Sequence, residues 1–589
     1  MLAGSNPSFS ARKAESSFEL LAFVLSGFKV APLPKLQLDS KKKKKEVSML
    51  KKYWQDLKTE FAGYGMKKFM KDLMAGLTVA AVALPLALAF GVSSGATAAS
   101  GLLTAIISGF VISLLGGAFY QISGPTGAMA AILMSIIAQY GLQGIFAATI
   151  MAGILLVLAG IFHLGRLTAY IPMPVIAGFT SGIAVIIALG QLNNFFGVTS
   201  QGSSALEKVG SYFTQAFSPN WTAVIVGGLV ILFMIFFPKK WNAVVPASLL
   251  AIVLATAASM VFSLPVATVG EIPSSLLLSD RFSFQNFNLS SLQGLLAPAV
   301  SIAALGMVES LLCGASAGRM TGVPLDNDRE LVAQGVGNII APLFGGIPAT
   351  AAIARTSVAI KSGAQTRLSG MFHAVVLLVS MLALGPLMAN IPLAALAGVL
   401  LVTAWRMNEW STIRYIFSRK FKGAILKFLA TMVATIVFDL TVAIVIGVVI
   451  ALVLLVARLS KLEIHFDEVN PDRLKGQDGP LPAVYDNAEV VYITGTILFA
   501  NTKMIGDIAT QLEGKSAVLF SMRGTSYMDI SGAQAFMELL QQLREKELPL
   551  YICGVSDSVM ETMERSGIVN YIGKEHFYWS VERALSETV

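Results

Sequence analysis

Two polar stretches, each broken by a proline, interrupt strongly apolar sequence at matching places in the two halves of the chain. The first reads Gln-Ile-Ser-Gly-Pro-Thr-Gly at 121–127, and the second reads Gly-Ile-Pro-Ala-Thr-Ala at 346–351. Neither can form an ordinary spanning helix, so its unwound backbone needs polar partners or a cavity that holds a ligand. Matched interruptions of this kind predict the substrate site of a membrane carrier.

The backbone around the two interruptions indicates which ligand would bind. If a helix begins just after each stretch, its unpaired N–H groups point at the centre of the membrane, and two such ends create partial positive charge suited to an anion. The alternative is that Pro125 and Pro348 are packing kinks whose polar groups are satisfied by neighbours. The residues predicted to bind the anion here are Ser123, Gly124, Thr126, Ala349, Thr350 and Ala351.

Arg355 is the second candidate for anion binding. It lies one or two turns beyond Ala349 inside an apolar half-helix, where a cation is costly. We expect Arg355 and its neighbour Ala354 to line the site, with the guanidinium adding a full positive charge. The alternative is that the side chain snorkels to the cytoplasmic interface.

Glu309 is the candidate for ion coupling. It is the single charged residue between Leu295 and Gly318, in the middle of a spanning stretch. A buried carboxyl group takes up and releases a proton as its surroundings change, which suits a coupling residue. The alternative is a neutral Glu that is permanently bonded to a carbonyl or to the broken helix. His163 and His373 lie near span ends and are interpreted as interfacial residues rather than proton relays.

The composition places the chain in a membrane. Hydrophobic residues make up 55% of it and charged residues 13%, which leaves too little polar surface for a soluble protein of this length. The net charge of +8 does not indicate nucleic-acid binding, because the basic residues fall between the apolar segments. We therefore expect the lipid bilayer, and no nucleic acid, as a partner.

Enzyme motifs are absent from the sequence. Gly514-Lys515-Ser516 resembles the end of a phosphate-binding loop, but Ala509 stands where that loop needs its first glycine. The four histidines are widely scattered and show no metal-ligand spacing. The sequence predicts no enzyme, no cofactor and no metal site.

The apolar segments predict about fourteen membrane spans, some of them short. If the lysine-rich N-terminus is cytoplasmic, the basic loops fall on the inner side, as the positive-inside rule requires. The inner-side residues include Arg166, Lys239 and Lys240, Arg319 and Arg329, Lys361 and Arg367, Arg406, Arg414, Arg419, Lys420 and Lys422, and Arg458 and Lys461. The spans lie near 72–91, 98–117, 121–138, 143–163, 174–197, 221–237, 243–263, 295–316, 331–344, 348–360, 366–386, 391–404, 424–441 and 442–459.

The spans group as seven plus seven. The second half would then enter with the opposite orientation, as in an inverted repeat with two half-helices. After about residue 465 the apolar runs shorten and read as alternating strands and helices, which predicts an α/β domain on the cytoplasmic side. We expect a tail and amphipathic lead-in at 1–64, partly disordered; a transmembrane domain at 65–464 with repeats near 72–263 and 295–459; and the α/β domain at 465–589.

The first fifty residues are open to three interpretations. They can be a disordered tail, a targeting signal, or sequence before a true start at Met49. Leu20–Val24 is too short to span a membrane, and Lys41–Lys45 can be solvated or can touch anionic lipid.

Spaced motifs occur in order through the membrane part of the chain: Leu84–Phe90, Gln121–Thr126, Pro174–Gly182, Glu309–Leu311, Glu330–Gly335, Asn338–Ile339, Gly345–Gly346 and Ala354–Thr356. Two more, Thr496–Asn501 and Asp529–Gly532, lie in the soluble part. From about residue 65 onward these motifs resemble the SulP anion transporters, the bacterial relatives of solute carrier family 26, and the soluble part resembles the family's STAS domain.

The resemblance implies a fold with a core and a gate domain, usually as a homodimer, that moves an anion by elevator-like alternating access. It adds Phe90, in the first span, to the predicted site. The region around residue 309 and the second interruption resemble the C4-dicarboxylate branch, whereas the first-span stretch resembles the bicarbonate branch. Leu86 stands where many members have Gln, a departure that weakens a carry-over of sulfate as substrate.

The family also bears on the coupling ion. Sodium-coupled bicarbonate members hold the cation with a carboxylate and hydroxyl groups, and Glu309, Thr126 and Cys313 stand at those positions here. A thiol is a poor ligand for sodium, so we expect a proton. Ile530 replaces the phosphorylated serine of small STAS proteins, so phospho-switching there is not expected.

These observations together predict a proton-coupled secondary transporter for a small anion, either a C4-dicarboxylate, bicarbonate or sulfate. It would lie in the bacterial inner membrane with both termini in the cytoplasm, and a cytoplasmic protein could bind its STAS domain. The alternatives are an anion channel or uncoupled exchanger, a sodium-coupled bicarbonate symporter, and a sensor that binds an anion without transporting it.

Overall fold

The computed structural model describes residues 49–587 apart from short stretches at 167–171, 201–204, 215–216, 239–240, 242–244, 284, 286–291, 439, 470–484 and 486. The predictions for residues 1–48, including the choice between tail and targeting signal, lie outside the described residues, as do Lys239 and Lys240. The chain forms two compact units, residues 1–448 and 449–589.

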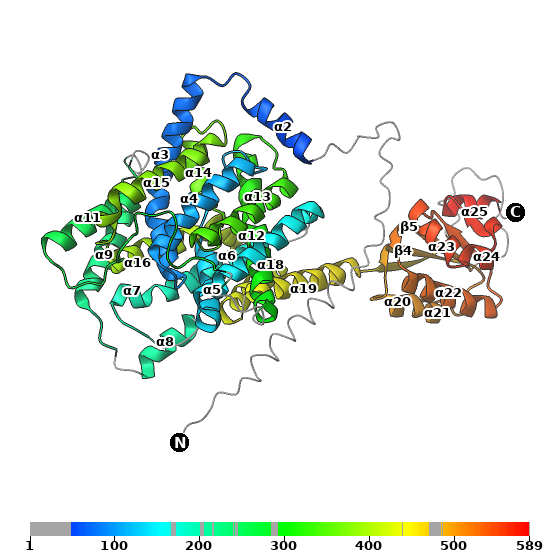
Figure 1. Ribbon diagram of the computed structural model, residues 1–589. Coiled ribbons are helices and arrows are strands. Elements are labelled where there is room, and N and C mark those ends of the chain that lie inside the picture. The colour runs from blue at the N-terminus through cyan, green and yellow to red at the C-terminus, as the bar shows by residue number, and fades with distance from the viewer. Residues whose placement is uncertain are drawn as a thin grey trace. The chain divides into compact units, whose positions relative to one another are not determined.

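The first unit is helical (Figure 1). Most of its helices are rich in Leu, Ile, Val and Ala with few charges, and six are long and apolar enough to cross a membrane. Four shorter apolar helices accompany them. Its principal helices are α2 (Met49–Glu60), α3 (Met66–Ser93), α4 (Ala98–Leu115), α5 (Gly127–Ile161), α6 (Met173–Gly190), α7 (Leu192–Phe196), α8 (Ala205–Thr214), α9 (Trp221–Phe236), α11 (Ala247–Val261), α12 (Leu292–Thr321), α13 (Asn327–Ile340), α14 (Ile353–Lys361), α15 (Leu368–Met388), α16 (Leu393–Met407), α17 (Trp410–Ser418) and α18 (Lys422–Val437). A further helix, α19 (Leu440–Leu459), begins in the first unit and ends in the second.

All fourteen predicted segments coincide with helical structure, and the number of membrane crossings stays a prediction. Two segments differ from the expectation at their starts. The segment at 121–138 begins with a short strand, β1 (Ser123–Gly124), and 348–360 begins with β2 (Thr350–Ala351). The spans predicted at 121–138 and 143–163 run on as α5, which kinks at Gly141, where φ is +65°.

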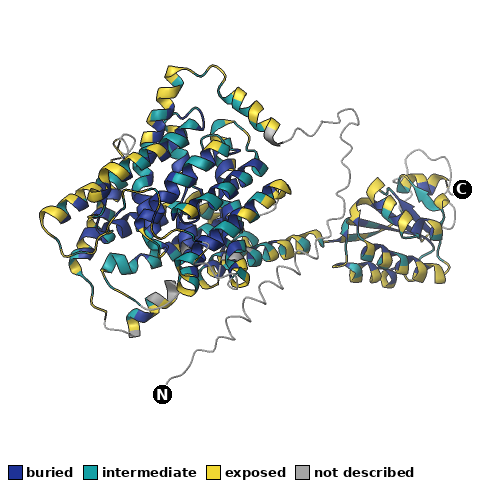
Figure 2. Cartoon of the chain, in the orientation of Figure 1, coloured by how far each residue is buried: buried dark blue, intermediate teal, exposed yellow. Residues whose placement is uncertain are grey.

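Helices from the two halves of the sequence interleave, and they sort into two groups by packing. In the first group α3, α4, α5, α12, α13, α14 and α15 contact one another. In the second group α6, α9, α11, α16 and α18 form the main contacts. Figure 2 shows the deepest burial where the helices of the first group cross.

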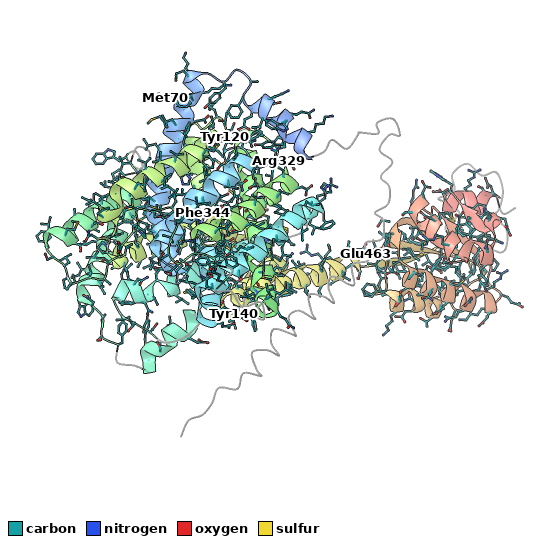
Figure 3. All side chains as sticks on the ribbon, in the orientation of Figure 1. Met70, Tyr120, Tyr140, Arg329, Phe344 and Glu463 are labelled. Carbon is teal, nitrogen blue, oxygen red and sulfur yellow. The ribbon has the colours of Figure 1, made fainter. Side chains whose placement is uncertain are left out.

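An amphipathic helix, α2, is tied to one end of the first group by three ion pairs. Glu60 pairs with Arg367 at 2.8 Å, both almost fully buried, and Asp56 pairs with Arg329 (labelled in Figure 3) at 2.5 Å. The third pair, at 2.7 Å, joins Lys52 to Asp326, with about half of the lysine side chain exposed. Charge pairs at residues 52, 56 and 60 therefore hold the lead-in to the membrane domain.

The second unit is an α/β domain with one five-stranded sheet in the order β3-β4-β5-β6-β7. β3 and β4 are antiparallel, and every later pair is parallel. The strands are β3 (Glu463–Glu468), β4 (Glu489–Ile497), β5 (Val518–Met528), β6 (Leu550–Cys553) and β7 (Phe577–Tyr578), and the helices are α20 (Thr502–Gly506), α21 (Ile508–Gln511), α22 (Ile530–Glu545), α23 (Asp557–Arg565), α24 (Ile568–Ile572) and α25 (Val581–Glu587).

Alternate residues of the sheet fill two cores, as the two-residue period of a strand requires. Phe520 and Ile552 face α22, α23 and α24, whereas Leu519 and Tyr551 face α25. The alternation of strands and helices predicted after about residue 465 is confirmed, since β4, β5 and β6 are separated by helices.

Candidate functional site

The two interruptions meet and pair with each other. β1 and β2 run antiparallel, with Ser123 opposite Ala351 and Gly124 opposite Thr350. All four residues are buried. This pairing satisfies part of the unwound backbone that made these stretches unusual in the sequence, and it brings residues far apart in the chain to one point.

A helix begins immediately after each strand. Thr126 caps α5, and its side-chain oxygen accepts a hydrogen bond from the backbone N–H of Met129 at 3.5 Å. Ala352 precedes α14, and no side chain caps that helix end. Ala354, in the first turn of α14, is exposed. The N-terminal ends of two helices thus start from one paired element, and each carries partial positive charge.

Arg355 extends from α14 into this junction and is 1% exposed. One terminal nitrogen donates to the carbonyl oxygen of Pro125 at 2.9 Å, and the other, Nη1, has no partner among the described residues. The burial contradicts the alternative in which this side chain snorkels to the interface. A buried guanidinium nitrogen without a partner is costly, and an anion is the natural group to occupy it.

Gly124 leaves room for that guanidinium. Its φ is +155°, and a Cβ built there would lie 2.7 Å from Nη1 of Arg355. Any side chain would therefore displace the charge from the β1 backbone. Glycine at this place in the motif is explained by the close approach of the arginine.

Glu309 approaches the same point from the middle of α12. Its Oε2 accepts a hydrogen bond from the Thr126 hydroxyl at 3.0 Å. A single threonine therefore caps α5 and contacts the only acidic side chain of the predicted site. The first-span residue Phe90 lies against the start of α5, since a Cβ on Gly127 would come within 3.0 Å of its ring.

Three polar residues on α13 make hydrogen bonds to the two interruptions and to the chain just before the first one. Glu330, Gln334 and Asn338 recur every four residues, which puts them on one face of the helix. Oε2 of Glu330 accepts from the N–H of Gly117 at 2.9 Å, and the Gln334 amide donates to Oγ of Ser123 at 2.9 Å. All three side chains are buried.

Asn338 fixes the second interruption. Its side-chain oxygen accepts from the N–H of Ala349 at 2.8 Å, and its nitrogen donates to the carbonyl oxygen of the same residue at 2.9 Å. Ile347, two residues earlier, bonds through both backbone groups to the hydroxyl of Thr104 on α4. Both backbone groups of Ala349 are thus already hydrogen-bonded within the protein, and neither is left over for a ligand.

Two further residues join α12 to the strands. The hydroxyl of Ser310 lies 2.9 Å from that of Thr350, and the Gln121 amide donates to the carbonyl oxygen of Ser310 at 2.9 Å. Sequence reasoning gave none of these supporting residues a role, although a Glu-Gln-Asn ladder at four-residue spacing in a buried segment is a usable signal.

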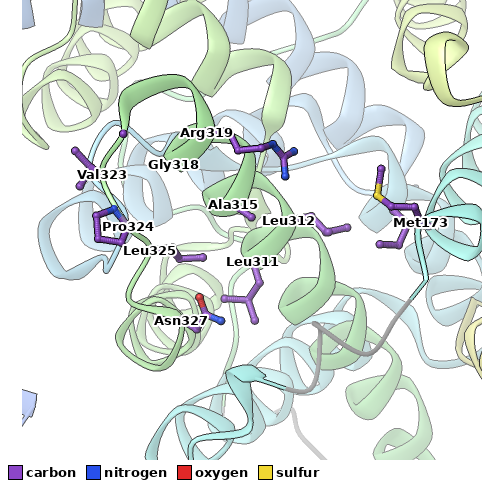
Figure 4. Close-up of a pocket in the computed structure, with 12 residues that line it drawn as sticks. Met173, Leu311, Leu312, Ala315, Gly318, Arg319, Val323, Pro324, Leu325 and Asn327 are labelled. Atoms are coloured by element: carbon purple, nitrogen blue, oxygen red, sulfur yellow. The ribbon is translucent and has the colours of Figure 1, made fainter. Parts of the chain in front are cut away.

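A cavity of about 610 Å³ lies between α12 and α6. Figure 4 shows Met173 across from Leu312 and Arg319. Its walls are apolar except for Arg319 and Asn327, and none of the residues predicted to bind the anion lines it. Leu311 and Leu312 connect this cavity in sequence to Glu309.

The interpretation of His373 as an interfacial residue was wrong. The side chain is completely buried on α15, and neither ring nitrogen has a partner among the described residues. Its ring lies against Gly109 of α4, because the helices approach closely there. His163, by contrast, is exposed and lies 2.7 Å from Asp328.

A profile of the Sulfate permease family matches residues 69–434, more than half of the chain. The chain belongs to this family. A STAS domain profile matches residues 480–584 of the second unit.

Two relatives support the family assignment, and one solved structure has the same fold. YvdB of Bacillus subtilis, named as a candidate sulfate transporter, is 37% identical over 533 residues, or 88% of this chain and 97% of its own. The bicarbonate transporter BicA of Picosynechococcus is 31% identical over 88% of this chain and 94% of its own. The murine anion transporter Slc26a9 in the inward-facing state gives a TM-score of 0.79 at 18% identity, covering 96% and 97% of the two chains, which shows the shared fold.

The chain is therefore an anion transporter of the sulfate permease family, an integral multi-pass membrane protein with a C-terminal STAS domain. The prediction of a transporter rather than an enzyme is confirmed by these relatives. The resemblance to the C4-dicarboxylate branch stays a prediction.

Proposed function

We propose that this family member is a proton-coupled secondary transporter for a small oxyanion, with bicarbonate or sulfate ahead of a C4-dicarboxylate. The observation that carries the proposal is the meeting of β1, β2 and the buried Arg355, whose Nη1 lacks a partner. Relatives named for sulfate and for bicarbonate support both substrates.

Anion binding follows from the charges at the junction. The start of α14, where no side chain caps the helix, supplies backbone donors, and Arg355 supplies the full positive charge. Thr350 can add a hydroxyl donor, whereas the Thr126 hydroxyl already donates to Glu309. Such donors suit an oxyanion, because each carboxylate or sulfate oxygen accepts several hydrogen bonds.

Proton coupling is assigned to Glu309. The carboxyl group bonds to Thr126, so a change in its protonation alters the cap of α5 as well as the charge beside Arg355. A proton carried with a monovalent anion cancels the net charge that crosses the membrane. Uncompensated charge would cost about 2.3 kcal/mol per 100 mV when it moves against the potential.

The two packing groups support movement of a core against a gate. Every residue assigned to anion or proton binding lies on the first group, which would move as the core. The cavity between α12 and α6 lies between the groups, where a core sliding past a gate would admit the anion. This arrangement favours elevator-like alternating access.

The remaining parts of the proposal concern the whole assembly. The basic loops favour placement in a bacterial inner membrane with both termini in the cytoplasm. A homodimer, and a cytoplasmic protein that binds the STAS domain, complete the proposal.

Uptake into proteoliposomes tests this function. Labelled bicarbonate, sulfate and succinate would be offered with an inward proton gradient, with an inward sodium gradient and with neither, at clamped membrane potential. We expect proton-driven uptake of at least one anion and its collapse in Glu309→Gln. Glu409→Gln, which changes an acid outside the site, is the matched control.

Each other outcome supports a different function. Gradient-independent exchange that survives in Glu309→Gln would favour an uncoupled exchanger or channel. Uptake driven by a sodium gradient alone would mean that sodium, and not a proton, is the coupling ion. Anion binding without transport would favour a sensor.

A further inference from the structure

The segment that joins α16 to α18 carries basic and aromatic side chains that the transport site does not use. Between Trp405 and Lys427 the sequence holds six basic residues and one acidic residue, Glu409. Glu409 already accepts a hydrogen bond from Thr412 at 3.0 Å. This segment, residues 405–427, is called the α17 segment below.

Four basic side chains of the α17 segment have no partner among the described residues, whereas Arg406 donates to the carbonyl oxygen of Met234 at 2.8 Å. Arg414, Arg419, Lys420 and Lys422 are all exposed. None of the four side chains has an ion-pair or hydrogen-bond partner among the described residues. Four cations gathered within nine residues repel one another, so the surface favours an anionic partner.

The aromatic residues of the same segment are also exposed. Trp405 is 66% exposed, Trp410 42% and Tyr415 58%, and Phe417 and Phe421 are 41% and 47% exposed. Trp410, Arg414 and Phe417 lie at positions i, i+4 and i+7 of α17, on one helix face. Ile416, on the other face, is buried at 4%. The helix therefore presents mixed aromatic and cationic groups outward while an aliphatic face holds it to the protein.

The position of α17 in the chain places it at the edge of a membrane. It is a nine-residue helix directly between two apolar helices, α16 and α18, both of which pack on α6. The chain turns tightly at Lys420, where φ is +53°, so α18 begins close to the end of α17. An exposed Trp and Tyr belt beside arginines and lysines is typical of a helix that lies at the level of lipid headgroups.

We propose that the α17 segment is a binding surface for anionic phospholipid headgroups and that it anchors the α6, α16 and α18 group in the bilayer. The cations bind the phosphates while the aromatic rings insert beside the acyl chains. If lipid holds the α6, α16 and α18 group in place, this group can act as the stationary gate past which the core moves. The inference needs only membrane placement and does not depend on which anion is transported.

Fluorescence quenching by brominated lipid tests the proposal. The full-length protein would be reconstituted in phosphatidylcholine vesicles that contain about 10% brominated phosphatidylglycerol or, separately, the same fraction of brominated phosphatidylcholine. The signal of Trp405 and Trp410 is the difference between the wild type and the double variant W405F/W410F. We expect the anionic quencher to be at least about twofold more effective than the neutral one, because local enrichment follows the basic charge.

Charge variants separate headgroup binding from general attraction. The ratio of quenching by the anionic lipid to quenching by the neutral lipid is expected to fall to about one in a variant that combines Arg414→Gln, Arg419→Gln, Lys420→Gln and Lys422→Gln. High salt should lower the ratio in the same way, because it screens exposed charges. The matched control neutralises four exposed basic residues of the STAS domain, Lys503, Lys546, Arg565 and Lys574, and should keep the wild-type ratio.

Equal quenching by both lipids in the folded wild type would overturn the proposal and would indicate that the surface meets protein instead. A ratio that survives in the fourfold α17 variant would overturn it too. The experiment does not measure transport, so its result can be interpreted even if the proposed transport function is wrong.

Discussion

At the scale of single residues, the unusual feature is a set of side chains whose hydrogen bonds go to backbone groups at the two interruptions. Arg355 donates to the carbonyl oxygen of Pro125, Thr126 caps α5, and Asn338 holds both backbone groups of Ala349. Such bonds fix an unwound chain that neither a helix nor a sheet can satisfy. The charged atoms left over, above all Nη1 of Arg355, are then available to a ligand.

Asn338 tests how far the second interruption depends on its support. Asn338→Leu would leave the buried N–H and C=O of Ala349 without partners, each at a cost of about 1–3 kcal/mol. We expect a lower thermal unfolding temperature and loss of anion uptake. Asn408→Leu is the control, because Asn408 bonds at the partly exposed end of α16. Equal behaviour of the two variants would contradict the proposed support.

Thr126 links the two proposed binding functions. Thr126→Val keeps the shape of the side chain but removes both the cap of α5 and the hydrogen bond to Glu309. The loss of a hydrogen bond to a carboxylate, about 1.5–3 kcal/mol, corresponds to a reduction of about tenfold or more in proton-driven uptake.

Thr126→Ser should restore most of the rate, since it keeps the hydroxyl. Thr97→Val, which removes a similar cap from α4, should leave uptake near the wild-type rate. A fully active Thr126→Val would mean that this hydroxyl has no part in coupling.

At the scale of elements, sequence reasoning located the helices and both interruptions because apolar periodicity and proline are local signals. It could not show that β1 and β2 pair, because the paired residues lie more than two hundred positions apart. It also left open whether Arg355 is buried or snorkels, a choice that depends on what surrounds α14. Arg329 and Arg367 were read as inner-loop charges, and their pairing with α2 follows from tertiary structure alone.

The α2 helix offers a comparison of buried and exposed ion pairs within one element. Glu60→Gln leaves Arg367 buried without its counter-charge and is expected to cost about 3–5 kcal/mol of stability. Lys52→Gln breaks an exposed pair and should cost no more than about 1 kcal/mol. Thermal unfolding of the two variants in detergent measures the difference. Similar small losses of stability in both variants would show that the buried pair of α2 does not stabilise the helices that it contacts.

At the scale of the whole molecule, the residues assigned to transport lie in the first unit, and the STAS domain lies in the second. The STAS domain buries its own two cores, and every residue assigned to the anion site lies between Phe90 and Arg355. Truncation after Leu459 should therefore keep the anion dissociation constant within about twofold, as measured by a thermal-shift titration. A folded truncated protein that no longer binds anion would show that the site requires the STAS domain.

The central claim is that Arg355 and the paired interruptions form the anion site, and the dissociation constant of Arg355→Gln tests it most directly. A thermal-shift titration with bicarbonate and with sulfate would compare the wild type, Arg355→Gln and Arg281→Gln, the last an exposed arginine far from β1 and β2 in sequence. Loss of a buried charged partner costs about 2–5 kcal/mol, so we predict binding weakened by about thirtyfold or more in Arg355→Gln and unchanged in Arg281→Gln. A folded Arg355→Gln protein that binds both anions as the wild type does would contradict the account.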